Sequence, residues 1–458
     1  MILFRLLAAL VLLALPLRAD EAGALREALA LGAAKDWTAA VRVAEGAGPV
    51  GADVVEWMRL RAGDGLLNEY EDFLKRRADW PGMAFLRQKG EVAVARSTTP
   101  ARVIGYFGAG RPATAEGAIA LVNALNATGR QGEAAEVAAR AWVDLRFSDV
   151  EETALLSLAP GLGARHEARL RRLLWDGRAE EARRMLPRVA APLRALAEAR
   201  LGLQANREGV NGLIAAVPAA LAGDAGLAHD RFQWRMNKGL YDSSAELILE
   251  RSANAESLGQ PEAWAHRRAA LARELMELGQ GRLAYRVAAS HKLKGGGDFA
   301  DLEFLAGFIA LTRLGDPATA KGHFAHLLEN VRTPISLSRA HYWIGRAEEA
   351  AGRADAARAA YAAAAAHPAA YYGLLAAEKL GRDLDASLLA ENRPPDWRQA
   401  PWARSSVLAA GRLLLQAGDR NTGKRFLLHL AEGLDVQGLD QLADMALATG
   451  EPHVAVLI

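Results

Sequence analysis

The chain of 458 residues is too long for one ordinary hydrophobic core, so we expect several domains or a modular array. Its 51% hydrophobic, 6% aromatic and 24% charged residues favour helices over sheets and order over disorder. The 56 basic and 54 acidic residues almost balance, which gives no support for a nucleic-acid partner, and the absence of cysteine excludes disulfides, a thiol nucleophile and a cysteine-ligated metal.

The first 19 residues predict a signal peptide. The segment Met1–Arg5 carries one positive charge, Leu6–Leu15 is uninterrupted and apolar, and the run ends on the small residue Ala19 before Asp20. The apolar run is half the length of the ~20 residues that a membrane-spanning helix needs. We therefore expect cleavage after residue 19, export to the periplasm and no membrane span in the mature chain. A retained N-terminal anchor is the alternative, because Leu17 is larger than the residue usual at that position.

One pattern recurs along the rest of the chain: an apolar-periodic segment, a glycine in a short polar turn, and a small residue five positions later. The turn glycines are Gly129, Gly177, Gly239, Gly279, Gly315, Gly352, Gly418 and Gly450. The small residues are Ala134, Ala182, Ser244, Ala284, Ala320, Ala357, Gly423 and Ala455. Nine residues after the turn a larger apolar residue often follows, as in Leu186, Ile248, Phe324, Tyr361 and Leu427.

The physical meaning of this pattern is a helical hairpin. A glycine supplies the left-handed residue that ends the first helix, and a small residue lets the second helix approach it closely. The C-terminal glycine spacings of 36, 37, 66 and 32 residues cluster near one or two times the ~34-residue period of tetratricopeptide-type hairpins. The earlier spacings of 48, 62 and 40 are irregular. Because strand signals are absent, we predict an all-α solenoid of tetratricopeptide-like hairpins, degenerate in its N-terminal half.

Two places near the C-terminus indicate organisation beyond the repeat. The segment Asn392–Pro395 breaks the helical pattern with two prolines and is the best candidate for a domain boundary. After Gly450, the expected second helix stops at Ile458 with the apolar run Val454–Ile458, whereas a natural array usually ends in a polar cap. We therefore expect the C-terminal domain to be truncated.

Several segments, taken together, resemble soluble lytic murein transglycosylases. The most characteristic stretches are Arg339–Gly352, Ala356–Tyr361 and His367–Glu378, and the others are Trp80–Gly82, Leu173–Arg184, Arg231–Gly239 and Thr333–Arg339. The resemblance covers essentially the whole chain after residue 19. Generic tetratricopeptide proteins share the turn pattern but not these stretches.

The resemblance implies a right-handed helical superhelix that closes into a ring over residues 20–393. A helical linker domain over residues 394–458 and a lysozyme-like catalytic domain would follow. In that family the catalytic domain cleaves the β-1,4 bond between N-acetylmuramic acid and N-acetylglucosamine and leaves a 1,6-anhydro end. It uses a glutamate in a Glu-Ser motif near a Gly-Leu-Met-Gln-type segment. Neither motif follows residue 450, and the Glu256-Ser257 pair lies in a predicted loop without the motif's surroundings. No catalytic residue is therefore assigned, and the substrate-binding residues stay unassigned.

These observations favour a non-catalytic, substrate-holding part of a periplasmic peptidoglycan lytic transglycosylase. Its partners would be glycan strands and the catalytic domain, and activity of this chain alone is left open. The chief alternative is a periplasmic tetratricopeptide-like adaptor that binds proteins and has no enzymatic role. A hydrolase with a site hidden among the repeats is the third possibility.

Other candidate sites have structural explanations. The pairs Glu151-Glu152, Glu180-Glu181 and Glu348-Glu349 lie in Ala- and Arg-rich helices, where we expect solvated faces rather than a general acid. His323, His326 and Glu329 share a helix face at a metal-compatible spacing, but nothing else metal-like accompanies them, so no metal or cofactor is predicted.

Glycines and tryptophans are interpreted in the same way. Gly295–Gly297 lacks the strand and lysine of a phosphate-binding loop and is expected to be a link. Trp175, Trp234, Trp264 and Trp343 lie on apolar helical stripes and are expected in the core rather than on a sugar-stacking surface. Trp397 and Trp402 flank the proposed boundary, and no Gly-x-Ser-x-Gly elbow occurs.

Overall fold

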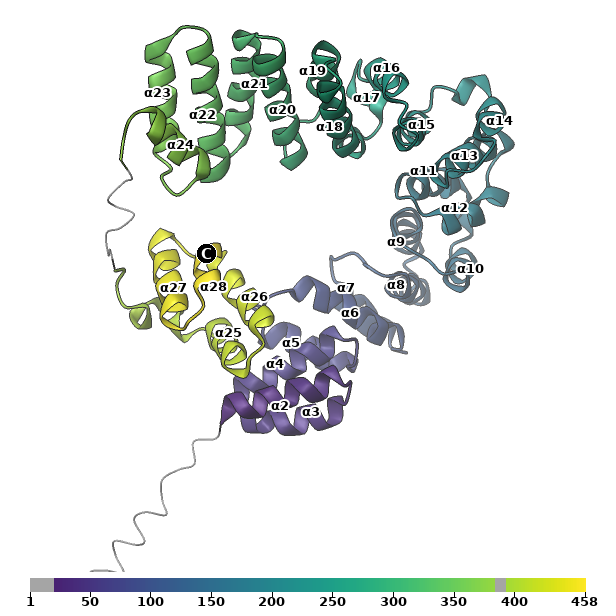
Figure 1. The fold of residues 1–458 in the computed structure, drawn as a ribbon. Coiled ribbons are helices and arrows are strands. Elements are labelled where there is room, and N and C mark those ends of the chain that lie inside the picture. The colour runs from purple at the N-terminus through teal and green to yellow at the C-terminus, as the bar shows by residue number, and fades with distance from the viewer. Residues whose placement is uncertain (1–19, 384–392) are drawn as a thin grey trace, which may run out of the picture. The chain divides into compact units, whose positions relative to one another are not determined.

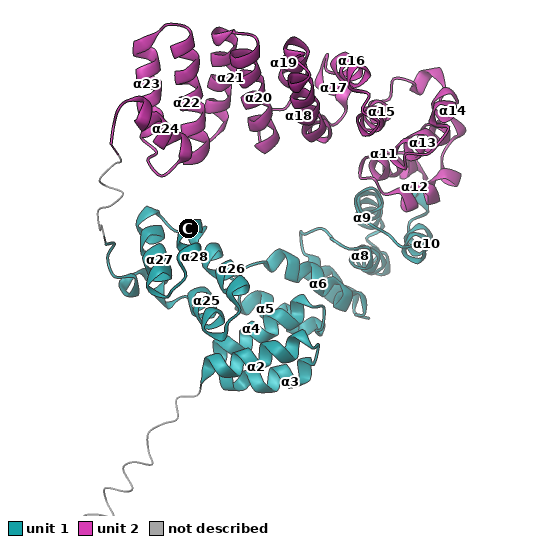
Figure 2. Ribbon diagram, viewed as in Figure 1, with its two compact units in different colours: residues 1–162, 392–458 teal, residues 163–391 magenta. Residues whose placement is uncertain are grey.

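The computed structural model describes residues 20–383 and 393–458, and within these residues all regular structure is helical, with no strand. The chain forms two compact units. Unit 1 combines residues up to Leu162 with the C-terminal segment from Asn392, and unit 2 contains Gly163–Glu391 (Figure 2). The predicted all-α fold built from helical hairpins is confirmed, whereas the right-handed superhelix and its closure into a ring stay predictions.

Unit 1 contains nine of the described α-helices from the N-terminal half of the chain and four from its C-terminus (Figure 1). They are α2 (Glu21–Ala33), α3 (Trp37–Ala44), α4 (Gly48–Arg61), α5 (Leu67–Arg76), α6 (Met83–Ala95), α7 (Pro100–Phe107), α8 (Ala115–Ala127), α9 (Gln131–Asp144), α10 (Asp149–Leu158), α25 (Ser406–Ala417), α26 (Arg420–Ala431), α27 (Val436–Ala448) and α28 (Pro452–Leu457).

Unit 2 is a continuous series of helices. They are α11 (His166–Trp175), α12 (Ala179–Met185), α13 (Ala191–Gln204), α14 (Val210–Ala215), α15 (Ala225–Asn237), α16 (Tyr241–Arg251), α17 (Ala255–Leu258), α18 (Pro261–Glu277), α19 (Gly281–Ala289), α20 (Gly297–Arg313), α21 (Pro317–Asn330), α22 (Pro334–Ala350), α23 (Ala354–Ala365) and α24 (Tyr371–Lys379). Consecutive helices contact each other along the chain, as α18 with α19, α20 with α21, and α22 with α23. The unit therefore has the neighbour-to-neighbour packing of a repeat array.

The turn glycines behave as the sequence predicts. All eight have a positive φ, between 64° at Gly315 and 94° at Gly418, which is the left-handed region that other residues avoid. Seven of the eight small residues that follow at position five are buried, and Ala455 is partly buried. The glycine ends one helix and the small residue brings the next one close, so the hairpin interpretation is confirmed.

A second set of glycines, which the sequence pattern did not include, lies on the first helix of several hairpins. A Cβ atom added at Gly307 would lie 2.5 Å from the ring of Phe324, and one added at Gly345 would lie 2.6 Å from the ring of Tyr361. At Gly411 the nearest atom would be on Leu427, at 3.1 Å. Phe324, Tyr361 and Leu427 are the large residues of the repeat pattern, so each inserts opposite a glycine. This allows a close approach of the two helices.

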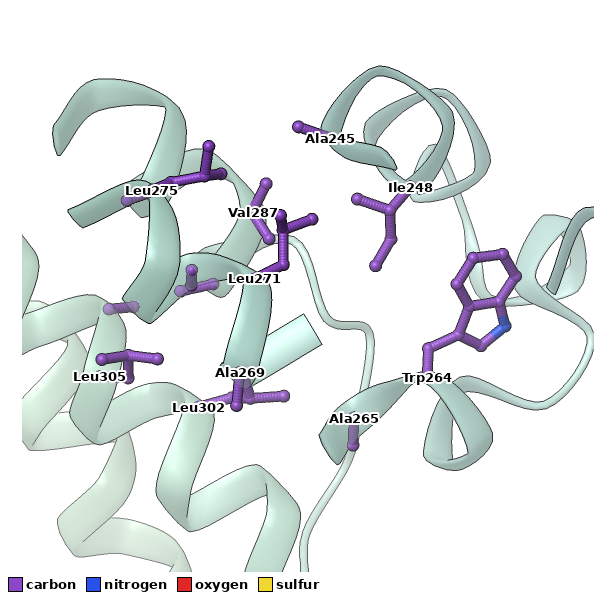
Figure 3. Packing of buried hydrophobic residues seen from close by; sticks show 14 of the residues in the cluster. Ala245, Ile248, Trp264, Ala265, Ala269, Leu271, Leu275, Val287, Leu302 and Leu305 are labelled. Atoms are coloured by element: carbon purple, nitrogen blue, oxygen red, sulfur yellow. The ribbon is translucent and has the colours of Figure 1, made fainter. Parts of the chain in front are cut away.

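One part of the unit 2 core lies between α15 and α20 (Figure 3). Trp264 is fully buried there, and its indole Nε1 donates a hydrogen bond to the carbonyl oxygen of Leu258 at 3.0 Å. Ile248, Leu271 and Val287 pack in the same cluster and come from three different helices. The core thus continues from one hairpin to the next instead of forming a separate globule for each.

Unit 1 joins segments that are more than 300 residues apart in the sequence. Helix α25 contacts α2 and α4, and the ring of Phe426 on α26 lies edge-on to Trp57 at 5.2 Å and to Trp80 at 5.0 Å. The indole Nε1 of Trp80 donates to the hydroxyl of Ser406 at 2.9 Å. Aromatic pairs of this geometry each contribute about 0.5–1.5 kcal/mol beyond the burial of their area. The C-terminal helices and the N-terminal helices therefore share one core.

Some predictions fall outside the described residues or stay untested. The predicted signal peptide lies within residues 1–19, outside the described residues. Part of the proposed boundary, Asn392, also lies outside them, and the domain limits 20–393 and 394–458 stay a prediction, because a compact unit is not the same as a functional domain. Among the described helices, none has the length and apolar character to cross a membrane. In the last helix Val454 is buried and Val456 is 84% exposed.

Candidate functional site

The predicted acidic pairs are only partly solvated. Glu152 is 1% exposed and Glu348 is 3% exposed, so the predicted solvated face is wrong for these two carboxylates. Glu348 accepts hydrogen bonds from Lys321 at 2.6 Å and from Arg353, and this pairing makes its burial tolerable. The residue before Glu152, Glu151, forms a capping box with Ser148 at the start of α10.

The other members of the pairs also have structural roles. The side chain of Glu180 is 81% exposed and pairs with Arg183, as expected for a solvated face. Glu181 is less exposed and pairs with Arg178 and Arg169. Glu349 accepts from the hydroxyl of Tyr361 at 2.8 Å. Glu151, Glu180, Glu181, Glu348 and Glu349 are each held by a cation, a hydroxyl or a helix cap, so none of these five has the geometry of a free general acid.

The Glu256-Ser257 pair forms part of a one-turn helix, α17, where the sequence predicted a loop. Asn254 caps this helix, and its side-chain oxygen accepts from the backbone nitrogen of Ser257 at 2.8 Å and from the Ser257 hydroxyl at 2.9 Å. The serine hydroxyl is therefore engaged in the cap. The Gly295–Gly297 segment leads into α20, whose first residue is Gly297, and Gly296 has a φ of 88°.

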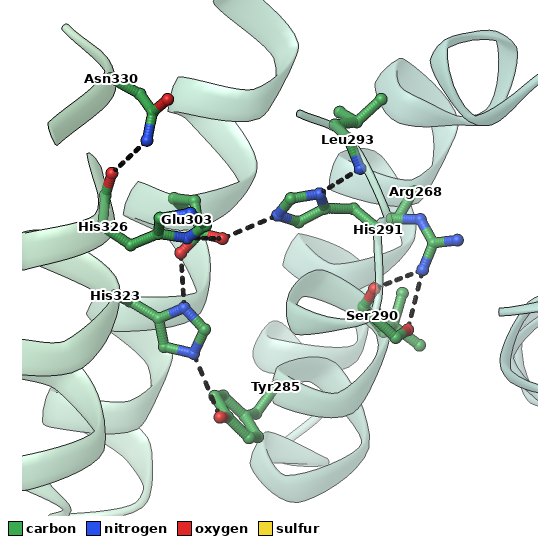
Figure 4. A network of polar contacts seen from close by, with 10 residues as sticks. Arg268, Tyr285, Ser290, His291, Leu293, Glu303, His323, His326 and Asn330 are labelled. Carbon is green, nitrogen blue, oxygen red and sulfur yellow. Dashed lines mark hydrogen bonds and ion pairs between the residues drawn. The ribbon is translucent and has the colours of Figure 1, made fainter. Parts of the chain in front are cut away.

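The histidines that share a helix face converge on a buried carboxylate (Figure 4). Their partner is Glu303 on α20 rather than Glu329, which is exposed. Glu303 faces His323 Nδ1 at 2.7 Å, His326 Nδ1 at 3.0 Å and His291 Nε2 at 3.0 Å. We call these four residues the Glu303 cluster. The sequence could not identify Glu303 and His291, because they come from α20 and from the segment before it.

The hydrogen bonds of the Glu303 cluster satisfy its polar atoms without a metal ion. The backbone nitrogen of Leu293 donates to His291 Nδ1 at 3.0 Å, which places the ring proton on Nε2, where it is donated to Glu303. A metal ligand at Nε2 would need that proton removed. Burial alone would raise the pKa of Glu303, but the hydrogen bonds from His291 and His323 lower it to about 2. In the described part of the chain, no group of three or more such side chains is arranged to hold a metal ion.

The four tryptophans expected in the core differ in how deeply they are buried. Trp264 is fully buried, as predicted. Trp175, Trp234 and Trp343 are half-buried, and Trp343 packs edge-on to Phe304 at 5.7 Å. At the proposed boundary, the rings of Trp397 and Trp402 stack at 6.4 Å with an interplanar angle of 12°.

A groove in unit 1 lies where the turn before α6 faces α26. Its volume is about 700 Å³, and its lining residues are Pro81, Gly82, Asn421, Lys424, Arg425, Leu428, His429 and Glu432. We call it the α26 groove. His429 fixes one wall, because its Nε2 donates to the carbonyl oxygen of Asp79 at 3.0 Å while its Nδ1 faces Glu432 at 3.2 Å. Both wall segments belong to the shared aromatic core described above.

A third cation stands beside the α26 groove. The guanidinium of Arg61 lies over the rings of Trp57 at 4.4 Å and Phe85 at 4.6 Å, which holds it by cation–π contacts. Its Nη1 atom is 2.6 Å from the position that a Cβ atom would take at Gly82, whose φ of 74° lies in the left-handed region that favours glycine. Burial, followed by the positive charge of Arg425, lowers the pKa of Arg61.

Lys424, Arg425 and Arg61 carry no counter-charge from the described residues. None of the three forms an ion pair or a side-chain hydrogen bond with any residue in 20–383 or 393–458. Glu432 is the one acidic side chain among the groove's lining residues, and it is bonded to His429. Lys424 and Arg425 can therefore accept an anion in the groove, and Arg61 adds positive charge beside it. Lys424 and Arg425 are adjacent in sequence, but Arg61 comes from a helix that the sequence pattern could not place beside them.

Comparison of the sequence with protein families finds no match, and no curated protein matches it either. Solved structures do match. The crystal structure of the 70 kDa soluble lytic transglycosylase from Escherichia coli has a TM-score of 0.60 and 15% identity, over 96% of this chain and 70% of that chain. The chain has the fold of the soluble lytic transglycosylases.

Two further structures agree with this assignment. A complex of the 70 kDa soluble lytic transglycosylase with bulgecin A has a TM-score of 0.59 and 16% identity, again over 96% of this chain and 70% of that chain. An inactive mutant of the lytic transglycosylase Slt from Pseudomonas aeruginosa has a TM-score of 0.57 and 15% identity, over 89% of this chain and 65% of that chain. The resemblance seen in the sequence is thus confirmed at the level of the fold.

Proposed function

We propose that this chain is the non-catalytic, substrate-holding part of a periplasmic peptidoglycan lytic transglycosylase. The supporting observation is the match over 96% of the chain to the soluble lytic transglycosylase fold, at a TM-score of 0.60. A long wall of helical hairpins offers a rigid surface along which an extended glycan strand can lie.

The cleavage chemistry is assigned to a catalytic domain outside residues 1–458. Glycosidic cleavage needs a carboxylic acid that can give up its proton to the leaving oxygen. In the predicted acidic pairs, the carboxylates other than Glu152 are held by cations, a hydroxyl or a cap, and the pKa of the buried Glu303 is lowered to about 2. An acid with so low a pKa is ionised near neutral pH and has no proton to donate.

The test is co-sedimentation of residues 20–458 with purified sacculi, followed by analysis of the soluble fraction for muropeptides. We expect the protein in the pellet and no anhydro-muropeptides in solution. Release of anhydro-muropeptides would show that the chain is itself catalytic. Failure to sediment with sacculi, together with capture of periplasmic proteins, would replace this proposal with the adaptor function.

A further inference from the structure

We propose that the α26 groove is a binding site for the carboxylates of peptidoglycan stem peptides. The inference rests on the proposed function, since it names the part of the glycan-bearing substrate that this chain holds. It assigns the groove to the peptide branch and its free carboxylates, whereas the wall of hairpins carries the sugar strand.

The first support is the charge of the groove. Lys424 and Arg425 line it, and Arg61 stands behind Gly82 at its edge. These cations have no carboxylate partner among the described residues, although 54 acidic residues are available to a chain of this composition. Uncompensated cations in a concave site attract an anion and strengthen its hydrogen bonds.

The second support is the rigidity of the cation that comes from the N-terminal helices. Two aromatic rings hold the guanidinium of Arg61, and the left-handed Gly82, with a φ of 74°, leaves room for it beside the backbone. A guanidinium held in this way is a fixed positive charge beside the groove, which favours a carboxylate bound to Lys424 and Arg425. Because less side-chain freedom is lost on binding, the site is pre-organised.

The third support is the chemistry of the remaining lining. Pro81 and Leu428 offer apolar contacts of the size of an alanine methyl group, and Asn421 offers an amide donor and acceptor for a peptide bond. A volume of about 700 Å³ accommodates a short peptide rather than a single small ion. A stem peptide combines carboxylates, methyl groups and amide bonds, so it matches all three features of the groove.

The experiment measures binding of a soluble disaccharide-pentapeptide muropeptide to residues 20–458 by calorimetry. The comparison probes are the same muropeptide with its carboxylates amidated and a peptide-free chitooligosaccharide. The wild-type chain should bind the acidic muropeptide at least about tenfold more tightly than either comparison probe, because charge-assisted hydrogen bonds are about twice as strong as neutral ones.

The decisive variant is Lys424→Ala with Arg425→Ala, and the matched control is Arg420→Gln. Arg420 lies on the same helix and is exposed, but it pairs with Glu451 at 2.9 Å and does not line the groove. The double variant should lose the preference for the acidic muropeptide, and the control should keep it. Circular dichroism and the melting temperature of each variant show that a loss of binding is not a loss of the fold.

Three outcomes would overturn the inference. Equal binding of the acidic muropeptide by the wild-type chain and the double variant would show that the groove does not bind it. Equal binding of the acidic and amidated muropeptides would show that the chain does not recognise the carboxylates. Tighter binding of an acidic oligoglutamate peptide than of the muropeptide assigns the groove to a protein partner. If the wild-type chain sediments with sacculi but shows no preference for the acidic muropeptide, this inference fails and the proposed function stands. If the wild-type chain does not sediment, the proposed function itself fails.

Discussion

Two regions of the molecule, the buried charge pairs of unit 2 and the α26 groove of unit 1, treat charge in opposite ways. In unit 2 the buried carboxylate of Glu303 is surrounded by His291, His323 and His326, and the fully buried Arg200 donates to Asp230 at 2.6 Å. In unit 1 the cations of the α26 groove have no such partners among the described residues. Buried charges must be compensated for the fold to be stable, whereas accessible charges can stay uncompensated for a ligand. The difference separates groups that hold the structure together from groups that are available to bind.

The largest loss of stability is expected for Asp230→Asn, which removes the counter-charge of the buried Arg200. Arg200 is 1% exposed, and the substitution leaves its guanidinium buried without a counter-charge. We expect the free energy of unfolding to fall by about 3–5 kcal/mol. Chemical denaturation measures it, with the exposed Asp242→Asn on α16 as the control, for which a change within about 0.5 kcal/mol is expected. Equal losses in the two variants would break the comparison.

A slightly smaller effect is expected for Glu303→Gln. The variant removes the charge that three histidines face, and about 2–3 kcal/mol of stability at neutral pH should be lost, since one pKa unit corresponds to about 1.4 kcal/mol. The measurement is urea denaturation at pH 7. A loss below half of this range would mean that the hydrogen bonds to a neutral amide replace those to the carboxylate.

The difference in stability between the wild type and Glu303→Gln should depend on pH. The pKa of Glu303 in the folded chain is about 2 and its usual value is 4.5, so the unfolded chain binds more protons between these two values. The stabilisation by Glu303 is therefore complete above pH 4.5 and is lost as the pH falls toward 2. The difference in stability between wild type and Glu303→Gln should narrow over this window, and a constant difference would contradict the assigned pKa.

Close helix packing in unit 2 is tested by Gly345→Ala. The added methyl group would lie 2.6 Å from the ring of Tyr361, and overpacking of this kind costs about 1–3 kcal/mol. Gly322→Ala is the control, because it lies on the exposed side of α21 with nothing within 4 Å of the added Cβ atom. There the helix propensity of alanine should stabilise the chain by up to about 1 kcal/mol. If Gly345→Ala and Gly322→Ala shift the melting temperature in the same direction, the close approach of α22 and α23 at Gly345 would be refuted.

The smallest change in stability is expected for the pair Lys424→Ala and Arg425→Ala. Neither side chain pairs with a described residue, so the free energy of unfolding should change by less than about 0.5 kcal/mol. Thermal unfolding followed by circular dichroism measures this. A large loss would show that these cations hold the fold, and the contrast with the buried charge pairs of unit 2 would disappear.

The hairpins could be predicted from the sequence because their determinants are local. A glycine such as Gly352 and a small residue such as Ala357 lie five positions apart, and the turn needs nothing from the rest of the chain. Gly345 was missed because its role is to face Tyr361 on the next helix, which is a tertiary contact. A glycine seven or eight residues before the turn is the signal that could have found it.

The charge clusters could be predicted only in part, for the same reason. The shared helix face of His323 and His326 was visible in the sequence, but Glu303 comes from another helix. The predicted solvation of Glu348 was wrong because Lys321, from the preceding helix, compensates its burial. The α26 groove depends on the shared core of α4 and α26, and no local pattern records a contact across more than 300 residues.

The most direct test of the account is the fraction of the chain that binds purified sacculi, measured against sodium chloride concentration for the wild type and for the Lys424→Ala, Arg425→Ala double variant. Salt screens accessible charges, with a Debye length that falls from about 10 Å at 0.1 M to about 3 Å at 1 M. The account predicts stronger wild-type binding at low salt and convergence of the two curves at high salt. Identical curves at every salt concentration would contradict it.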